Sequence, residues 1–318
     1  MRSLVVGGAG FIGSHLVERL ALRGPVTVFD DLSVGRREHL VEAERRGELR
    51  LVVGDARELD ALLAIAPGHD VLFHLAANPE ARWGLERPRL DLELGTIATW
   101  NALEAARRSS IPRFVLASSG TVYGEAPGAS REAELGALPI SLYGASKLAG
   151  EAMLSAYVEC FGLSGRILRF GNVVGPRGTH GAALDFLKKL RDTRGAELEV
   201  LGDGRQKKPY LHVDDCVSGL LYALEHGEEP LGIYNLAPPD ETSVSTIAAL
   251  CVAASPYPNA PIRYTGGARG WPGDVPRSSL DPSKLAALGF RVGASSDEAV
   301  RRAVAELARE VYAEEARA

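Results

Sequence analysis

The chain has 318 residues, of which 46% are hydrophobic and 24% are charged, and its 36 Lys and Arg against 41 Asp and Glu give a formal net charge of −5. A chain of this length buries a full core without disulfides or metals, and this charge balance provides neither a basic field for nucleic acid nor an acidic solvating tail. The cysteines, Cys160, Cys216 and Cys251, lack zinc-ligand or disulfide-framework spacing. No apolar stretch has signal-peptide or membrane-spanning length. We therefore expect a cytoplasmic protein with no metal, membrane or nucleic-acid partner.

The first half of the chain alternates apolar runs of strand length with amphipathic segments of helix length. The runs cover residues 4–6, 26–29, 51–53, 71–75 and 114–116, and long helices are expected at 11–23, 88–108 and 143–161. Apolar strands separated by helices are typical of a sheet that is covered on both faces. The pattern therefore predicts an α/β fold with a doubly wound parallel sheet.

Beyond about residue 171, Gly and Pro become more frequent and the regular segments shorten, which indicates a second, smaller, loop-rich lobe. We expect residues 1–171 to form the first domain, with 211–238 returning to it, and residues 172–210 and 239–318 to form the second lobe. The last segment is a predicted helix, because Ser295 and Glu298 form a capping box ahead of apolar residues at helical spacing.

A glycine turn follows the first predicted strand. Gly7, Gly10 and Gly13 are spaced by three, and Phe11 and Ile12 begin the helix. The first glycine permits a tight turn, the second lets backbone approach a pyrophosphate, and the third lets helix and strand pack closely. The turn therefore predicts a dinucleotide site.

Two carboxylates close the second predicted strand. Asp30 follows Gly7 by 23 residues, near the distance at which an acid binds an adenosine ribose diol, and Asp31 comes next. A carboxylate there repels a 2′-phosphate, which favours NAD over NADP, although Arg36 and Arg37 just beyond would suit that phosphate. The alternative is that these arginines are solvated loop charges.

Two further strand ends fit a bound dinucleotide. Asp55 and Ala56 follow the third strand, where Asp55 is expected near the adenine. Small backbone-exposing residues follow the fourth strand, where a cofactor must lie flat on the chain; they are Leu75, Ala76 and Ala77.

The chemical centre is predicted from a tyrosine and a lysine four residues apart. Tyr143 and Lys147 lie one turn apart on the same helix face. Ionising a tyrosine near pH 7 requires about 4 kcal/mol, which the lysine and a positively charged nicotinamide are expected to supply. Ser119, Gly120 and Thr121 lie where the fifth strand ends, at the sheet edge that binds ligands in open α/β folds.

The glycine turn, Asp30, His-Leu-Ala-Ala, Ser-Ser-Gly-Thr-Val-Tyr-Gly and Tyr-x-x-x-Lys, in this order, resemble the extended short-chain dehydrogenase/reductases, specifically the sugar-nucleotide epimerase/dehydratase family. The resemblance covers nearly the whole chain and implies a Rossmann domain with an α/β substrate-binding lobe. It also implies NAD, held through the residues above together with Tyr143, Lys147 and Phe170.

The same resemblance implies where a nucleotide sugar binds. Residues 169–177 are similar to the segment that crosses to the second lobe, residues 201–215 to a nucleotide-binding hairpin, and residues 270–275 to a C-terminal signature. The implied substrate residues are Asn78, Ser119, Gly120, Thr121, Tyr143, Asn172, His180, Val200, Arg205, Gln206, Lys208, Arg269 and Asp274.

The residues that follow the fifth predicted strand limit which reaction of the family the chain can catalyse. Relatives that dehydrate the sugar carry an Asp-Glu pair there, whereas this chain has Gly120 and Thr121. Without two carboxylates the elimination lacks its acid and base, so we expect C4 redox chemistry. The chain most resembles the UDP-galactose 4-epimerases, which implies that ionised Tyr143 deprotonates the sugar 4-hydroxyl, Ser119 steadies the oxygen, and NAD takes up and returns the hydride.

Departures from the family pattern leave the substrate open. Lys208 stands where the family has an arginine in the hairpin. Trp271 stands where a second arginine is usual, so Arg269 is expected to take over that role. Leu94 stands where an asparagine is usual. A small residue at Ser278 suggests that UDP-GlcNAc also fits, and His180 is either a pocket residue or a plain loop residue.

Three alternatives remain. UDP-glucuronate 4-epimerase would need a cation such as Arg177 or Arg82, a net NAD-dependent reductase would release NADH, and a non-catalytic dinucleotide-binding regulator would keep only the fold. By analogy with relatives that pair helices of two subunits, we expect a homodimer whose partner-facing residues lie within 92–108 and 143–161.

Overall fold

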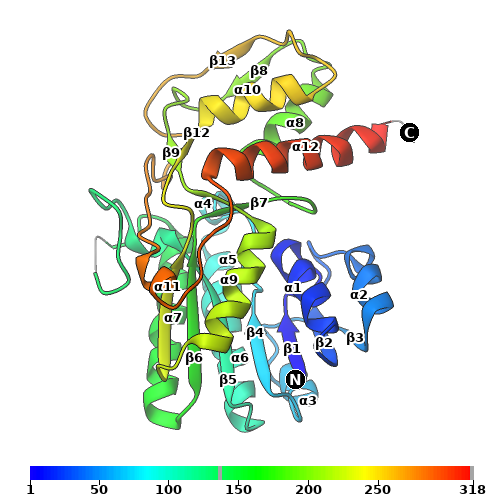
Figure 1. The fold of residues 1–318 in the computed structure, drawn as a ribbon, viewed down its shortest axis with the longest axis vertical. Coiled ribbons are helices and arrows are strands. Elements are labelled where there is room, and N and C mark those ends of the chain that lie inside the picture. The colour runs from blue at the N-terminus through cyan, green and yellow to red at the C-terminus, as the bar shows by residue number, and fades with distance from the viewer. Residues whose placement is uncertain (135–137, 316–318) are drawn as a thin grey trace. The chain divides into compact units, whose positions relative to one another are not determined.

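The computed structural model describes residues 1–134 and 138–315, and of residues 314 and 315 only the backbone. Its central element is a seven-stranded sheet in the order β11-β6-β5-β4-β1-β2-β3, in which the pairs from β3 to β5 are parallel (Figure 1). The predicted α/β class with a doubly wound sheet is confirmed. The chain divides into two units, of which the first comprises Met1–Val122, Ser141–Arg169 and Val217–Tyr234, and the second Tyr123–Ile140, Phe170–Cys216 and Asn235–Ala318.

The sheet strands are β1 (Ser3–Val6), β2 (Val26–Asp30), β3 (Leu49–Val53), β4 (Val71–His74), β5 (Arg113–Ser119), β6 (Ser164–Phe170) and β11 (Leu231–Leu236). The helical segments of this part are α1 (Phe11–Ala21), η1 (Arg37–Leu40), α2 (Val41–Arg46), α3 (Leu59–Ile65), α4 (Trp83–Glu86), α5 (Arg89–Asp91), η2 (Leu92–Ile97), α6 (Ala98–Arg108), η3 (Gly120–Tyr123), α7 (Leu142–Phe161) and α9 (Val213–His226).

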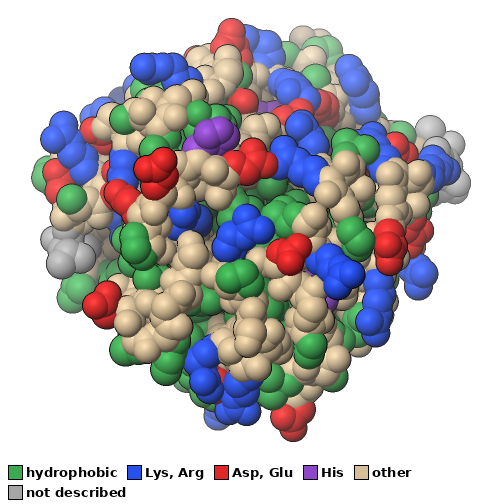
Figure 2. Space-filling model, turned by 60° about the horizontal axis from the view of Figure 1, so that its bottom comes forward, with side chains coloured by type: hydrophobic (Ala, Val, Ile, Leu, Met, Phe, Trp, Pro, Cys, Tyr) green, Lys and Arg blue, Asp and Glu red, His purple; other side chains and the backbone are tan. Residues whose placement is uncertain are grey.

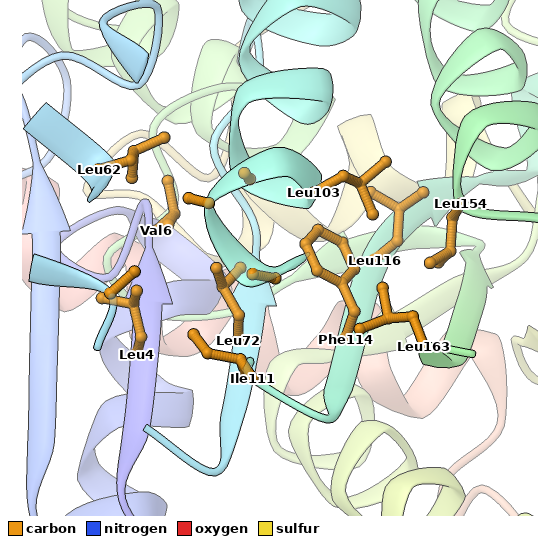
Figure 3. Close-up of a cluster of buried hydrophobic side chains, with 14 of the residues drawn as sticks. Leu4, Val6, Leu62, Leu72, Leu103, Ile111, Phe114, Leu116, Leu154 and Leu163 are labelled. Carbon is orange, nitrogen blue, oxygen red and sulfur yellow. The ribbon is translucent and has the colours of Figure 1, made fainter. Parts of the chain in front are cut away.

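The core of the first unit lies between the sheet and helices α3, α6 and α7. Leu62, Leu103 and Leu154 come from these helices and pack with side chains of β1, β4 and β5 (Figure 3). Because neighbouring residues of a strand point to opposite faces, Leu4 and Val6 lie in this cluster while Val5 does not. Burial on both faces explains why the strands read as continuous apolar runs, with β1 and β4 buried at every residue.

The helix predicted over 88–108 is interrupted. Residues Leu92–Ile97 form a π-helical stretch between α5 and α6. At Gly95 an added Cβ would lie 2.2 Å from Ser146 Oγ, so this stretch approaches α7 more closely than any side chain would allow. π-helical turns often accompany functional sites, and this one lies beside the helix that carries Tyr143 and Lys147.

The second unit has its own core of buried side chains from α8, α10 and α12. Its elements are β7 (Asn172–Val174), α8 (Ala182–Asp192), β8 (Leu198–Val200), β9 (Lys207–Lys208), β10 (Tyr210–His212), β12 (Thr242–Ser243), α10 (Val244–Ala254), β13 (Ile262–Tyr264), α11 (Ser283–Ala287) and α12 (Ser296–Glu315). The capping box of the last helix is present, because Ser295 and Glu298 each accept a backbone hydrogen bond from the other.

The hairpin expected over residues 201–215 does not form. Strand β9 pairs with β12 and strand β10 pairs with β7, although only Pro209 separates β9 from β10. One residue is too short a loop for two strands to fold back on each other. The units also differ from the expected domains, since residues 123–140 belong to the second unit.

No helix among the described residues is both long and apolar enough to cross a membrane. On the face drawn in Figure 2, acidic and basic side chains are interspersed, as the small net charge leads one to expect.

Candidate active site

The glycine turn after β1 is built as the spacing predicts. Gly7 has φ +82°, and a Cβ there would lie 2.6 Å from the backbone nitrogen of Ala76. A Cβ at Gly13 would lie 2.1 Å from the Gly7 carbonyl oxygen, whereas one at Gly10 would come no closer than 3.4 Å to any atom. Gly7 and Gly13 are thus required by the fold, and Gly10 leaves backbone open at the N-terminus of α1, where helices favour anionic groups.

Asp30 closes β2 with its carboxylate anchored to backbone. Its oxygens accept hydrogen bonds from Ala9 N at 2.9 Å and Leu32 N at 2.9 Å, and burial raises the pKa of this carboxyl. Each oxygen keeps a second lone pair for a ribose hydroxyl. Asp31 is exposed and accepts hydrogen bonds from Ser33.

The residues predicted near the adenine are already engaged. The Arg57 guanidinium lies beside Asp55, at 2.5 Å between Nη2 and Oδ2, and lowers the pKa of that carboxyl. The Ala56 carbonyl accepts a hydrogen bond from Asn101 at 2.9 Å. Any adenine contact of Asp55 must therefore share its carboxylate with Arg57.

Ser119, Tyr143 and Lys147 come together in the first unit. The side chains of Ser119 and Tyr143 are hydrogen-bonded, and Lys147 Nζ lies 5.7 Å from the Tyr143 ring centroid. Thr121 donates its hydroxyl to Ser119 Oγ at 3.0 Å, so the Ser119 hydrogen is left to be donated to Tyr143. Lys147 is buried and donates to the Ala117 carbonyl at 2.8 Å, which fixes the ammonium on β5.

The pKa values of this pair differ from the expectation. Burial, and next the charge of Asp91, raise the pKa of Tyr143 to about 12, while the bond to Ser119 lowers it. Burial lowers the pKa of Lys147 to about 8, against the opposing effect of Glu151 and Asp91. We expected Lys147 to lower the pKa of Tyr143, but burial and the charge of Asp91 dominate and raise it.

A buried network of ion pairs and hydrogen bonds, which was not predicted from the sequence, is centred on Glu151, one helical turn after Lys147. Arg169 binds both oxygens of Glu151, at 2.6 Å between Nη2 and Oε2, and Ser118 donates to the same carboxylate. Glu151 follows Lys147 by four residues, a spacing that would have placed both on one helix face. The network ties α7 to the ends of β5 and β6.

Asn78 is turned toward the protein. Its amide donates to Asp91 Oδ1 at 3.0 Å, and its carbonyl oxygen accepts the Glu80 backbone N–H at 3.1 Å. Its predicted role as a substrate residue would compete with these bonds. Asp91 itself was not predicted, because nothing in its spacing relates it to Tyr143 or Lys147.

In the second unit, the two cations expected to meet phosphate are paired with acidic groups. Lys208 Nζ lies 2.6 Å from Asp274 Oδ1. Arg269 donates to the Asp274 carbonyl at 2.7 Å and forms an ion pair with Glu125 at 2.7 Å. Asp274 also accepts a hydrogen bond from Gly270 N at 3.2 Å. The C-terminal signature and the β9 segment are thus joined through one carboxylate.

Gln206 of this unit has a buried side chain with unused hydrogen-bonding capacity. It is buried, and neither atom of its side-chain amide has a hydrogen-bond partner among the described residues. Arg205 beside it is exposed, and its backbone closes a turn on Asp203. A buried amide with unused donor and acceptor is a site at which a polar ligand group is expected.

The remaining predicted site residues differ in how far they are buried. Asn172 is exposed and hydrogen-bonded to the Tyr210 side chain, His180 is exposed beside Thr179, and Phe170 is buried. Val200 was expected to contact substrate, but its side chain is fully buried in the core of this unit and has no surface to offer a ligand.

Comparison with known proteins fits this architecture. Residues 3–237 match the NAD dependent epimerase/dehydratase family. A "UDP-glucose 4-epimerase" of Mycolicibacterium smegmatis is 32% identical over 96% of this chain and 97% of its own, and a "Probable UDP-glucuronate 4-epimerase" of Rhizobium meliloti is 29% identical over 96% of each. A crystal structure of a UDP-galactose 4-epimerase superposes with a TM-score of 0.87 at 39% identity, covering 98% of this chain and 99% of that one.

The chain belongs to the NAD-dependent epimerase/dehydratase family. It is an enzyme that acts on a nucleotide sugar at C4, and its cofactor is NAD. The residues present fit that cofactor, because the open backbone at Gly10, the tight approach of Gly7 to Ala76 and the anchored Asp30 carboxylate form the cradle that a dinucleotide needs.

Proposed function

We propose that the protein is a UDP-glucose/UDP-galactose 4-epimerase. The observation that carries this proposal is the arrangement of Ser119, Tyr143 and Lys147 at the end of β5, with Gly120 and Thr121 in place of the two carboxylates that an elimination needs. A hydroxyl-handling pair without further acids or bases suits oxidation and re-reduction of one carbon.

The chain's own groups then act on one oxygen. Ser119 donates a hydrogen bond to the sugar 4-oxygen. Tyr143, which would be ionised once a positively charged cofactor is bound, takes the 4-hydroxyl proton and returns it after the face of the sugar has changed. Lys147 holds its charge beside the phenol. Bound NAD supplies the acceptor and the donor of the hydride, so no net redox change occurs and the cofactor stays bound through turnover.

The second unit offers groups for the nucleotide. We propose that Gln206 binds a polar edge of the nucleotide, because burial of an unpartnered amide costs about 1–3 kcal/mol that a ligand would recover. Lys208, Arg269 and Asn172 are proposed to bind the diphosphate, with Asp274 positioning both cations. His180 and Arg205 are exposed and remain candidates for the same ligand.

A neutral hexose is favoured over a uronic acid. Arg82, one of the two cations that could meet a sugar carboxylate, is paired with Glu80 at 2.6 Å, so its charge is already matched. The other, Arg177, donates its backbone N–H to Glu310 at 3.2 Å, so a carboxylate already lies beside this residue. The partly buried Ser278 is small enough that UDP-GlcNAc stays a second proposed substrate.

The test is a substrate panel. The purified protein is incubated without added NAD, separately with UDP-glucose, UDP-galactose, UDP-GlcNAc and UDP-glucuronate, and the anomeric protons are followed by NMR. We expect glucose and galactose forms to interconvert. Interconversion of the uronates alone would contradict the proposal in favour of the UDP-glucuronate enzyme, and a lasting rise in NADH absorbance with excess NAD would indicate a net dehydrogenase.

A second copy of the chain is the proposed protein partner. Several large hydrophobic side chains of the η2–α6 and α7 segments are exposed, namely Leu92, Ile97, Trp100, Leu142 and Phe161. An apolar face of this kind on two neighbouring helices suits an isologous pairing between subunits.

A further inference from the structure

Asp91 is a buried acid that the proposed reaction does not use. Only 1% of its surface is exposed, one oxygen accepts the Asn78 amide at 3.0 Å, and the other has no hydrogen-bond partner among the described residues. That second oxygen lies against Gly84, where an added Cβ would come within 2.3 Å of it. A carboxylate is expensive to bury with half of its acceptors unused, so its retention calls for a function.

The position of Asp91 relates it to the tyrosine and the lysine. It ends α5, next to the π-helical stretch that packs on α7, and Gly84, against which its carboxylate lies, also approaches Leu142, the residue before Tyr143. Asp91 is a source of negative charge felt by both Tyr143 and Lys147.

The other charged groups around this pair are matched or neutral. Glu151 is engaged by Arg169, and His74, whose pKa burial and Lys147 lower to about 3, is neutral at physiological pH. Glu93 pairs with Arg57 and Arg89, and Glu80 pairs with Arg82. Among the described residues, Asp91 is therefore the carboxylate near Lys147 that lacks a cation of its own.

We propose that Asp91 is a positioning residue of the epimerisation, whose carboxylate, held by Asn78, is the counter-charge of Lys147 and keeps Tyr143 a phenol until a positively charged cofactor is in place. The proposal rests on the proposed function. It explains why both polar atoms of the Asn78 side chain are hydrogen-bonded within the protein, and why Gly84 packs directly against the Asp91 carboxylate. An idle enzyme without oxidised cofactor would then carry no reactive phenolate.

The consequence for pH dependence has a definite sign. Catalysis needs Tyr143 to lose its proton and Lys147 to keep its own, so the two limbs of the pH profile report the titration of this coupled pair. Asp91 raises the pKa of both groups. Removing its charge must therefore move both limbs to lower pH, by about one pH unit for one neighbouring buried charge.

The experiment compares two variants. Asp91→Asn removes the charge and keeps an oxygen for the Asn78 amide, whereas the control Glu93→Gln removes a carboxylate that is already paired with Arg57 and Arg89. We expect both limbs of the kcat/KM profile to shift by about one unit to lower pH in Asp91→Asn, and neither to shift in Glu93→Gln. Should Asp91→Asn not fold, Asp91→Ser carries the same expectation.

A second readout separates this proposal from the function on which it rests. The phenolate absorbance of the NAD-loaded protein, taken as the difference from the Tyr143→Phe variant, titrates Tyr143 without any substrate. We expect its midpoint to fall in Asp91→Asn. A profile and a midpoint that both stay in place while activity drops would overturn the proposal, whereas absence of epimerisation in the wild type would overturn only the proposed function.

Discussion

Glycines of the turn after β1 differ in what a methyl group would meet. At Gly13 a Cβ would lie 2.1 Å from the Gly7 carbonyl oxygen, which belongs to rigid backbone, whereas at Gly10 the nearest atom is 3.4 Å away. The fold thus requires a glycine at position 13. At position 10 a glycine is needed only if a ligand binds against the backbone. The two positions separate the folding role of the turn from its binding role.

We therefore predict opposite outcomes for two alanine substitutions. Gly13→Ala should lower the free energy of unfolding by about 2 kcal/mol or more, because backbone must move. Gly10→Ala should leave the unfolding of the cofactor-free protein nearly unchanged and weaken NAD binding at least tenfold, because its methyl occupies the approach of the pyrophosphate. Urea denaturation and calorimetric titration with NAD measure the two effects. Equal NAD affinity in Gly10→Ala and wild type would place the pyrophosphate elsewhere.

The turn, Asp30, Tyr143 and Lys147 could be predicted from the sequence because each lies at a fixed spacing within one strand–turn–helix or helix. Asp91 and the Arg169 pair of Glu151 could not, because their roles depend on contacts between elements distant along the chain. The pKa of Tyr143 shows the same limit: the spacing to Lys147 is local, but the burial that dominates the pKa is tertiary.

At the scale of elements, α7 carries Tyr143 and Lys147, and exposed apolar side chains lie on the η2–α6 segment and on α7. Ile97 is 39% exposed and Phe161 55% exposed, while the opposite sides of the two helices form the core with Leu103 and Leu154. A dimer built on this face would brace the helix that holds Tyr143. The dimer was expected by analogy with relatives, with its contacts within 92–108 and 143–161. The π-helical stretch at Leu92–Ile97 was not foreseen, since it depends on the close approach at Gly95.

The proposed dimer is tested by a charge placed on that face. We predict that the wild-type protein sediments at twice its chain mass of 33.9 kDa and that Ile97→Arg sediments at the chain mass, because a buried unpaired charge costs several kcal/mol. Leu22→Arg is the matched control, since Leu22 is 63% exposed at the end of α1, away from α6 and α7 in the sequence. A wild-type protein that sediments as a monomer at micromolar concentration would refute the dimer.

At the scale of the whole molecule, Tyr143 and Lys147 lie in the first unit and Gln206 and Lys208 in the second, and each unit has its own core. The α/β class was predictable because short, mostly apolar strands alternate with segments of helix length throughout the first half of the chain. The pairing of β9 with β12 was not, because a two-residue strand carries no periodicity and its partner lies more than thirty residues away. If the second unit binds the nucleotide as proposed, this division suits an epimerase, which must hold the nucleotide firmly while the hexose changes face.

The central claim is that one carbon gives up a hydride and receives the same hydride back. UDP-galactose carrying deuterium at C4 is incubated with the protein and no added cofactor, and the UDP-glucose formed is examined by NMR and mass spectrometry. We predict that the deuterium stays at C4 of the product and that Tyr143→Phe slows its formation by about 10²- to 10⁴-fold. Loss of the deuterium to solvent, or its appearance at another carbon, would contradict the account.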